Sequence, residues 1–97
     1  MPKGYWIAHI DVTNPEGYKE YVALNALAFA KYGAKALVRG GKFVKKHGDA
    51  RARHVVLEFE SYEKALACYE SPEYRAAEIV RNKHSNGDVI VIEGYEG

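Results

Sequence analysis

The feature that most constrains this chain is the alternation of residue types along four short segments. Each segment is rich in aromatic and β-branched residues and is bounded by turn-forming residues, which is typical of β-strands. The segments span residues 5–12, 36–38, 53–59 and 89–93. Beyond Gly40 and Gly41, residues 42–46 fit either a bent continuation of the second strand or one arm of a hairpin.

Between the strands, apolar residues recur three or four positions apart, which predicts helices. The helices are expected over residues 16–31, 62–69 and 72–83. Asn14 and Pro15 are typical of a helix start, and Gly33 is typical of a helix end. Ser61 and Ser71 are predicted caps of the second and third helices.

The order of these elements is β-α-β-β-α-β, with the second helical region interrupted at Ser71. This order is typical of the ferredoxin-like fold, in which helices cover one face of an antiparallel sheet. We therefore predict an α+β ferredoxin-like sandwich. No repeat, linker or low-complexity segment interrupts it, so residues 1–97 are expected to form one domain.

Side chains along a strand point alternately to opposite faces, so each strand divides into two sets. One set is wholly apolar and is predicted to lie under the helices: Trp6, Ala8, Ile10, Val12, Ala36, Val38, Val55, Leu57, Phe59, Ile90 and Ile92. The other set is mixed: Tyr5, Ile7, His9, Asp11, Lys35, Leu37, Arg39, His54, Val56, Glu58, Val89, Val91 and Glu93. A mixed face this rich in apolar residues usually marks an interface. We expect a second copy of the chain to cover it, so that two sheets close into a barrel-like homodimer.

The mixed set also supplies the candidate site residues. Carboxylates beside imidazoles or a guanidinium in a secluded interior acquire shifted proton affinities. The predicted catalytic residues are His9, Asp11, His54 and Glu58, and the predicted substrate-binding residues are Arg39, Tyr5 and Glu93. Opposite charges on neighbouring strands would also satisfy a buried dimer seam, so a purely structural role is an equal alternative.

Composition and charge exclude several classes of protein. The 14 Lys and Arg against 13 Asp and Glu leave a net charge of +1, without the concentrated basic face that nucleic-acid binding needs. The single cysteine, Cys68, cannot form an internal disulfide and is expected to be a small buried residue. Neither a membrane-spanning run nor a leader pattern is present, so we expect a cytoplasmic protein.

Four histidines suggest a metal site, but only His9 and His54 share a predicted face. No close ligand spacing such as H-x-x-x-H accompanies them. We therefore expect neither a metal nor a cofactor.

Five blocks of the sequence resemble a known bacterial family, the domain-of-unknown-function 1330 family. They are GYWIA from Gly4, DVTNPE from Asp11, LVRGG from Leu37, VVLEF from Val55 and ACYESPEY from Ala67. The resemblance implies a ferredoxin-like subunit of the dimeric α/β-barrel superfamily. That superfamily includes cofactor-free monooxygenases, small-molecule isomerases and lyases, and stress-responsive proteins, so the resemblance does not choose a function.

The leading functional hypothesis is a homodimer that binds a small, partly apolar, anionic molecule. The site is expected between the sheet and the covering helices or the partner, with Arg39 and His54 holding the ligand. One alternative is a cofactor-independent enzyme in which His9 or His54 moves a proton and Asp11 or Glu58 orients that imidazole. The other is a non-catalytic dimerisation module.

Overall fold

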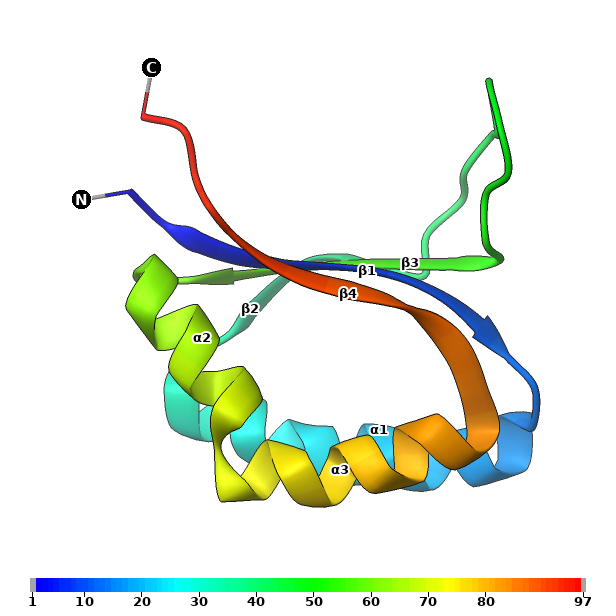
Figure 1. Ribbon diagram of the computed structural model, residues 1–97, viewed down its shortest axis with the longest axis horizontal. Coiled ribbons are helices and arrows are strands. Elements are labelled where there is room, and N and C mark those ends of the chain that lie inside the picture. The colour runs from blue at the N-terminus through cyan, green and yellow to red at the C-terminus, as the bar shows by residue number, and fades with distance from the viewer. Residues whose placement is uncertain (1, 97) are drawn as a thin grey trace.

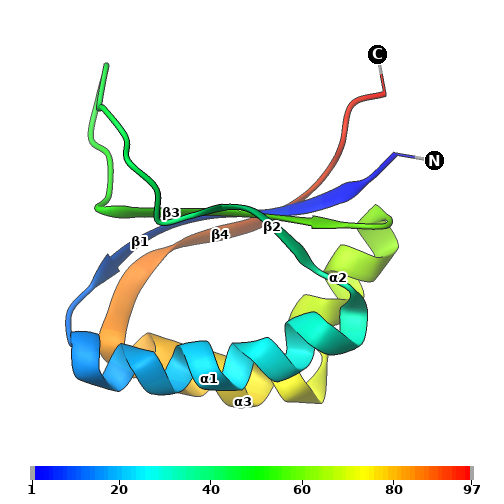
Figure 2. The same cartoon turned by 180° about the vertical axis from the view of Figure 1, so that it is seen from behind.

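The computed structural model describes residues 2–96 as two layers, with a sheet on one side and helices on the other (Figures 1 and 2). The elements in chain order are β1 (Gly4–Val12), α1 (Pro15–Tyr32), β2 (Lys35–Arg39), β3 (Arg53–Phe59), α2 (Tyr62–Glu70), α3 (Pro72–His84) and β4 (Ser85–Glu93). The strands form one antiparallel sheet in the order β2-β3-β1-β4. The predicted ferredoxin-like α+β architecture is confirmed.

The predicted helix signals act as expected. The Asn14 side chain accepts a hydrogen bond from the backbone N–H of Gly17, and Pro15 begins α1. Gly33 ends the helix in the left-handed conformation, with φ of 71°. Ser71 separates α2 from α3, because its hydroxyl donates to the carbonyl of Cys68 (2.7 Å) and accepts from the N–H of Tyr74 (3.1 Å).

The core lies between the sheet and the helices and is centred on Trp6. The Trp6 ring contacts Phe29 of α1, Phe59 of β3, Tyr69 of α2 and Tyr74 of α3, with centroids 4.8–5.5 Å apart. Its indole N–H donates to the carbonyl of Ala65, 2.8 Å away. One strand residue therefore ties all three helices to the sheet.

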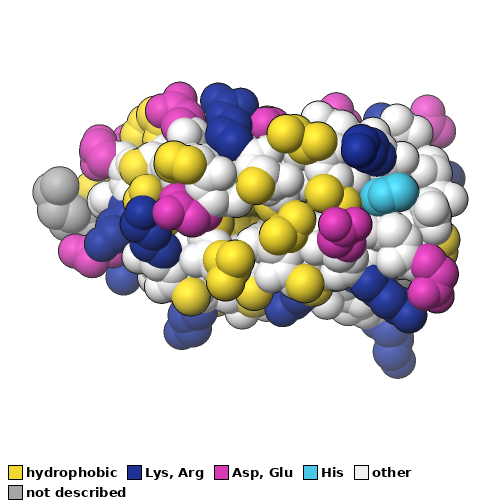
Figure 3. Space-filling model, turned by 90° about the horizontal axis from the view of Figure 1, so that it is seen from below, with side chains coloured by type: hydrophobic (Ala, Val, Ile, Leu, Met, Phe, Trp, Pro, Cys, Tyr) yellow, Lys and Arg dark blue, Asp and Glu magenta, His cyan; other side chains and the backbone are white. Residues whose placement is uncertain are grey.

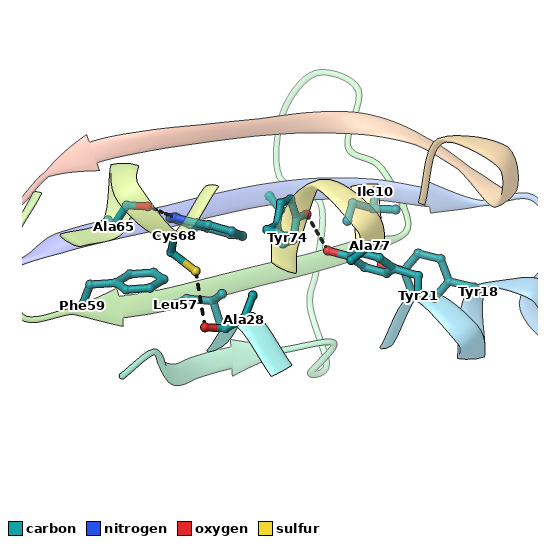
Figure 4. Packing of buried hydrophobic residues seen from close by; sticks show 12 residues of the cluster. Ile10, Tyr18, Tyr21, Ala28, Leu57, Phe59, Ala65, Cys68, Tyr74 and Ala77 are labelled. Carbon is teal, nitrogen blue, oxygen red and sulfur yellow. Dashed lines mark hydrogen bonds between the residues drawn. The ribbon is translucent and has the colours of Figure 1, made fainter. Parts of the chain in front are cut away.

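Cys68 is buried in this core, as predicted, and its thiol lies 3.8 Å from the carbonyl of Ala28 (Figure 4). Burial, with a further contribution from Glu73, raises the pKa of the thiol to about 12. The thiolate is the reactive form of cysteine, so Cys68 is a packing residue rather than a nucleophile.

The predicted faces are correct for β1 and β3 but wrong for β4. Trp6 pairs with Val91 and Ala8 pairs with Val89, so these valines face the core. Ile90 and Ile92, predicted to lie under the helices, are 50% and 44% exposed on the opposite face. Both residue sets of β4 are apolar, so alternation alone could not show which set is buried.

The predicted faces are also wrong for part of β2, because the strand contains a bulge between Ala36 and Val38. The extra residue shifts the alternation by one position. Val38 therefore pairs with Val56 on the open face, although it was predicted to lie under the helices. Arg39 pairs with Val55 on the helix side, although it was predicted to lie on the open face.

The sheet face turned away from the helices, here called the open face, carries a continuous apolar row. Val38, Val56, Ile7 and Ile90 are successive cross-strand partners through all four strands. The segment between β2 and β3 and the described residues next to both chain ends rise on this side of the sheet (Figure 1). These segments flank the open face at its two ends.

On the opposite side of the molecule, the helix layer shows apolar side chains scattered among charged ones (Figure 3). Leu27 of α1 and Ile79 of α3 are among its exposed apolar residues. None of the helices described within residues 2–96 is both long and apolar enough to cross a membrane.

Candidate functional site

A cavity of about 240 Å³, here called the inner cavity, lies between α1 and the helix side of the sheet. Most of its wall is aromatic or aliphatic, and its polar side chains come from α1, β2, β3 and α3. They are Tyr18, Tyr21, Asn25, Arg39, Arg53 and Tyr74. A largely apolar cavity with a few convergent polar groups is typical of small-molecule sites.

Two arginines from neighbouring strands supply positive charge to this cavity. Arg53 begins β3, whose alternation places it on the helix side, and Arg39 ends β2, where the bulge places it on the same side. Among residues 2–96, neither guanidinium forms an ion pair with a carboxylate, and the buried Nε of Arg53 has no hydrogen-bond partner. The inner cavity therefore contains cationic groups that no carboxylate in the described part of the chain pairs with.

Gly40 and Tyr18 hold the Arg53 guanidinium from two sides. A Cβ at Gly40 would lie 2.6 Å from Nη1 of Arg53, and Gly40 has φ of 70°, so both space and backbone conformation favour glycine here. The guanidinium carbon lies 6.0 Å from the centre of the Tyr18 ring. Burial raises the pKa of Tyr18, so this side chain is a neutral partner of the arginine.

A second cavity, here called the outer cavity, lies on the open face and has a volume of about 560 Å³. Its lining is mainly polar: His9, Asp11, Asp49, Ala50, Arg51, His54 and Asp88. Arg51 bridges two strands, with Nη1 2.9 Å from Asp11 and Nε 3.5 Å from Asp88. The N–H of Ala52 and the Arg51 guanidinium lower the pKa of Asp11, which keeps this carboxylate ionised.

His9 and His54 face each other across β1 and β3 in the outer cavity. Their Nδ1 atoms are 2.8 Å apart, so one ring donates a hydrogen bond and the other accepts it. Phe43 packs against the His54 ring with centroids 4.4 Å apart, and the buried Nε2 of His54 has no partner among the described residues. One hydrogen bond therefore joins the two imidazoles at this point.

The predicted pairing of a histidine with Asp11 or Glu58 does not form. Asp11 is bound to Arg51 and Ala52, and Glu58 accepts a hydrogen bond from the Tyr5 hydroxyl at 3.2 Å. Burial and then Glu58 raise the pKa of Tyr5. Tyr5 and His9 are four residues apart on β1, roughly 13 Å at ~3.3 Å per residue, so the Tyr5–Glu58 pair is separate from the histidines.

The structure also separates the two residues predicted to hold a ligand together. Arg39 lines the inner cavity and His54 lines the outer cavity, on opposite faces of the sheet. Glu93 lies opposite Gly4 at the end of β4 and lines neither cavity. It is two and four residues from Val91 and Val89, so it belongs to the set of β4 residues on the helix side and not to the open face. The prediction that these three residues share one interior is wrong, because of the bulge in β2 and the reversed face of β4.

Sequence reasoning missed Arg53, Arg51 and Asp88. Arg53 precedes Val55 and Leu57 by even steps, so the alternation of β3 placed it on the helix side. An arginine in an otherwise apolar set is the signal that could have identified it. Arg51 lies in the segment between β2 and β3, which carries no alternation, and Asp88 lies in β4 just before the strand that was predicted to begin at residue 89. Within residues 2–96, no cluster of three or more His, Cys, Asp and Glu side chains is arranged to hold a metal ion.

The fold and its two cavities define a ferredoxin-like protein with an apolar cavity under the sheet and a polar one above it. Residues 3–95 match the domain of unknown function family DUF1330, and the chain belongs to this family. The resemblance seen in the sequence blocks is thereby confirmed.

Several solved structures share the fold at low sequence identity. RPA0582, a protein of unknown function from Rhodopseudomonas palustris, is 13% identical, with 99% of this chain and 85% of that chain covered and a TM-score of 0.72. SnoaB, a cofactor-independent oxygenase from Streptomyces nogalater, is 12% identical, with 100% and 97% covered and a TM-score of 0.64. A dimeric ferredoxin-like protein of unknown function from Thermobifida fusca is 13% identical, with 95% and 91% covered and a TM-score of 0.59. No curated protein matches the sequence significantly.

We expect the two histidines to adopt different tautomers, with Nδ1–H of His54 donating to Nδ1 of His9. Nε2 of His54 is buried without a partner, and an unbonded N–H there would cost more free energy than an unbonded lone pair. His9 is exposed, so its Nε2–H can donate to water. Proton–nitrogen correlation spectra of the imidazole rings report the tautomers, and the exposed loop residue His47 serves as a reference. Two rings both protonated at Nε2 would contradict this arrangement.

Proposed function

We propose that this protein binds a small, partly apolar anion in the inner cavity. The observation that carries the proposal is the Arg53 guanidinium, which lines an apolar cavity, pairs with no carboxylate of residues 2–96 and has a buried Nε without a partner among them. A guanidinium suits a carboxylate because its planar donors match the two oxygens. Arg39, already predicted to bind substrate, lines the same cavity and adds a second positive charge.

The size of the inner cavity limits the ligand. Its volume of about 240 Å³ lies just below the ~300–1,000 Å³ that is usual for drug-sized ligands. A single substituted aromatic ring or a short branched acid is of suitable size. The apolar body of such a ligand would lie against residues such as Phe29, Val55 and Leu57, and its carboxylate would lie against Arg53.

Replacing Arg53 with Met is expected to remove binding of aromatic carboxylates, because the substitution keeps the apolar stem and deletes the charge. Isothermal titration with a panel of substituted benzoates and their neutral methyl esters measures the effect. The native protein should bind acids and not esters, and the variant should lose at least tenfold in affinity for the acids. Lys35→Met, a charge deletion on exposed β2 outside both cavities, is the matched control and should change little. Equal binding of acids and esters by the native protein would refute the proposal.

We further propose that two copies of the chain pair through their open faces. The apolar row of Val38, Val56, Ile7 and Ile90 is the support, because monomeric proteins rarely expose a contiguous apolar patch of this kind. The Thermobifida fusca protein, which shares the fold, is described as dimeric. Pairing would also seclude the outer cavity from bulk water.

Ile90→Asp is expected to dissociate the dimer, because it places a charge within the apolar row. Ile79→Asp is the matched control: Ile79 is 61% exposed on α3, so the same substitution there should leave assembly unchanged. Light scattering across micromolar concentrations measures the mass of each variant. A native protein that stays monomeric over this range would contradict pairing.

Cofactor-independent catalysis in the outer cavity is the second candidate function. The contact between Nδ1 of His9 and Nδ1 of His54 at 2.8 Å supports it, because it orients two imidazoles in a cavity, and imidazole is the side chain most often used to transfer a proton to or from a substrate. SnoaB, which shares the fold, is described as a cofactor-independent oxygenase. In this version His9 or His54 moves the proton, and Arg51, Asp11 and Asp88 supply the charges around it.

His54→Gln is expected to abolish proton exchange on a substrate bound in the outer cavity. Small enolisable keto acids incubated with the native protein in heavy water should gain deuterium, which mass spectrometry detects. His47→Gln, in the exposed loop, should exchange at the native rate. If the His54 variant exchanged deuterium at the native rate, the His9–His54 pair would not be the group that transfers the proton.

A further inference from the structure

A chain of three polar side chains runs from α3 to the wall of the inner cavity. Nη1 of Arg81 lies 2.9 Å from the hydroxyl of Tyr74, which lies 2.7 Å from the hydroxyl of Tyr21. Figure 4 shows the Tyr21 and Tyr74 hydroxyls pointing toward each other from α1 and α3. Tyr21 and Tyr74 both line the inner cavity.

The direction of this hydrogen-bond chain follows from the donors at its start. A guanidinium can only donate, so the Tyr74 oxygen accepts from Arg81. Tyr74 is 1% exposed, and burial raises the pKa of its hydroxyl, which therefore keeps its proton. A buried O–H needs an acceptor, and among residues 2–96 the one oxygen in reach that can accept is that of Tyr21. Tyr74 therefore donates to Tyr21.

Tyr21 is left with a hydroxyl proton that no side chain accepts. Its oxygen receives the proton of Tyr74, and within the described part of the chain its hydroxyl forms no other hydrogen bond. Asn25, one turn further along α1 in the same cavity wall, is not bonded to it. Tyr21 is only 6% exposed, so the remaining direction for its proton is the inner cavity.

The charge of Arg81, at the start of this hydrogen-bond chain, makes the Tyr21 hydroxyl at its end a stronger donor. Hydrogen bonds to a charged group are stronger than neutral ones, and successive bonds polarise one another in a low-dielectric interior. Arg81 is itself held in place by Tyr69 and by Glu78, whose Oε2 lies 3.5 Å from Nη2. The cation therefore cannot turn away without breaking several contacts.

We propose that Tyr21 is a specificity-determining donor of the inner cavity, oriented by Arg81 through Tyr74, and that the ligand is a keto or acyl acid. Its uncharged carbonyl oxygen accepts from Tyr21, while its carboxylate binds Arg53. This inference rests on the proposed binding of an anion in the same cavity. Arg81 and Tyr74 act here as positioning residues, and of these three side chains only Tyr21 donates a hydrogen bond to the ligand.

The test compares two probes that differ only in the acceptor, para-acetylbenzoate and the nearly isosteric para-isopropylbenzoate. The native protein should bind the ketone roughly three- to tenfold more tightly, as one neutral hydrogen bond allows. Tyr21→Phe should erase this preference without abolishing binding of either acid. Tyr32→Phe, which removes a hydroxyl from the same helix but outside the inner cavity, is the matched control and should keep the preference.

Two further variants separate positioning from packing. Arg81→Met should reduce the preference toward that of Tyr21→Phe, whereas Arg81→Lys, which keeps a cationic donor, should restore part of it. The ratio of the two affinities is insensitive to a general loss of stability, which thermal unfolding of each variant measures separately. A native protein that binds both acids equally, with Arg53 still required, would overturn the role of Tyr21 while leaving anion binding intact.

A measurement without ligand decides the orientation even if neither acid binds. Tyrosine is labelled with ¹³C at the ring carbon that carries the hydroxyl. The deuterium isotope shift of this carbon in NMR spectra then reports how fast each hydroxyl proton exchanges with water. The proton of Tyr74 should be protected, and that of Tyr21 should exchange rapidly through the inner cavity. The reverse pattern would show that Tyr21 donates to Tyr74 and would overturn the proposal.

Discussion

The packing around Trp6 is the interaction on which the rest of the structure depends. Its ring contacts an aromatic residue in each of the three helices, and its N–H is satisfied by the carbonyl of Ala65. These contacts hold the helix layer against one face of the sheet. The inner cavity adjoins this aromatic cluster, because Trp6, Phe29 and Tyr74 also line it.

The sheet separates two chemical environments that share one strand. Arg53 and His54 are consecutive residues of β3, so their side chains point to opposite faces. Arg53 lines the apolar cavity on the helix side, and His54 lines the polar cavity on the open face. Anion binding and proton transfer are therefore supported at different places, and a single combined site is not.

Element order could be predicted from the sequence because each strand and helix has a clear start or end, such as Pro15, Gly33 and Ser71. The buried faces of β1 and β3 could be predicted because one set of residues is apolar and the other is not. The run Val89-Ile90-Val91-Ile92 gives no such contrast, so only the observed register shows which side is covered. The bulge in β2 has no signature in the sequence, and it moves Arg39 to the other face. The candidate site was thus less predictable than the fold, since one inserted residue reassigns a functional side chain.

Gly40 connects the two faces at the level of the backbone. Its N–H donates to the carbonyl of His54 at 2.9 Å, and its missing side chain leaves room for the guanidinium of Arg53. Any larger residue at this position would have to push the arginine aside or loosen the strand that carries the histidine. Substitutions near Gly40 that aim to change ligand preference would therefore alter both the Arg53 cavity and the His9–His54 pair. Substitutions further along α1 would leave the histidine pair unchanged.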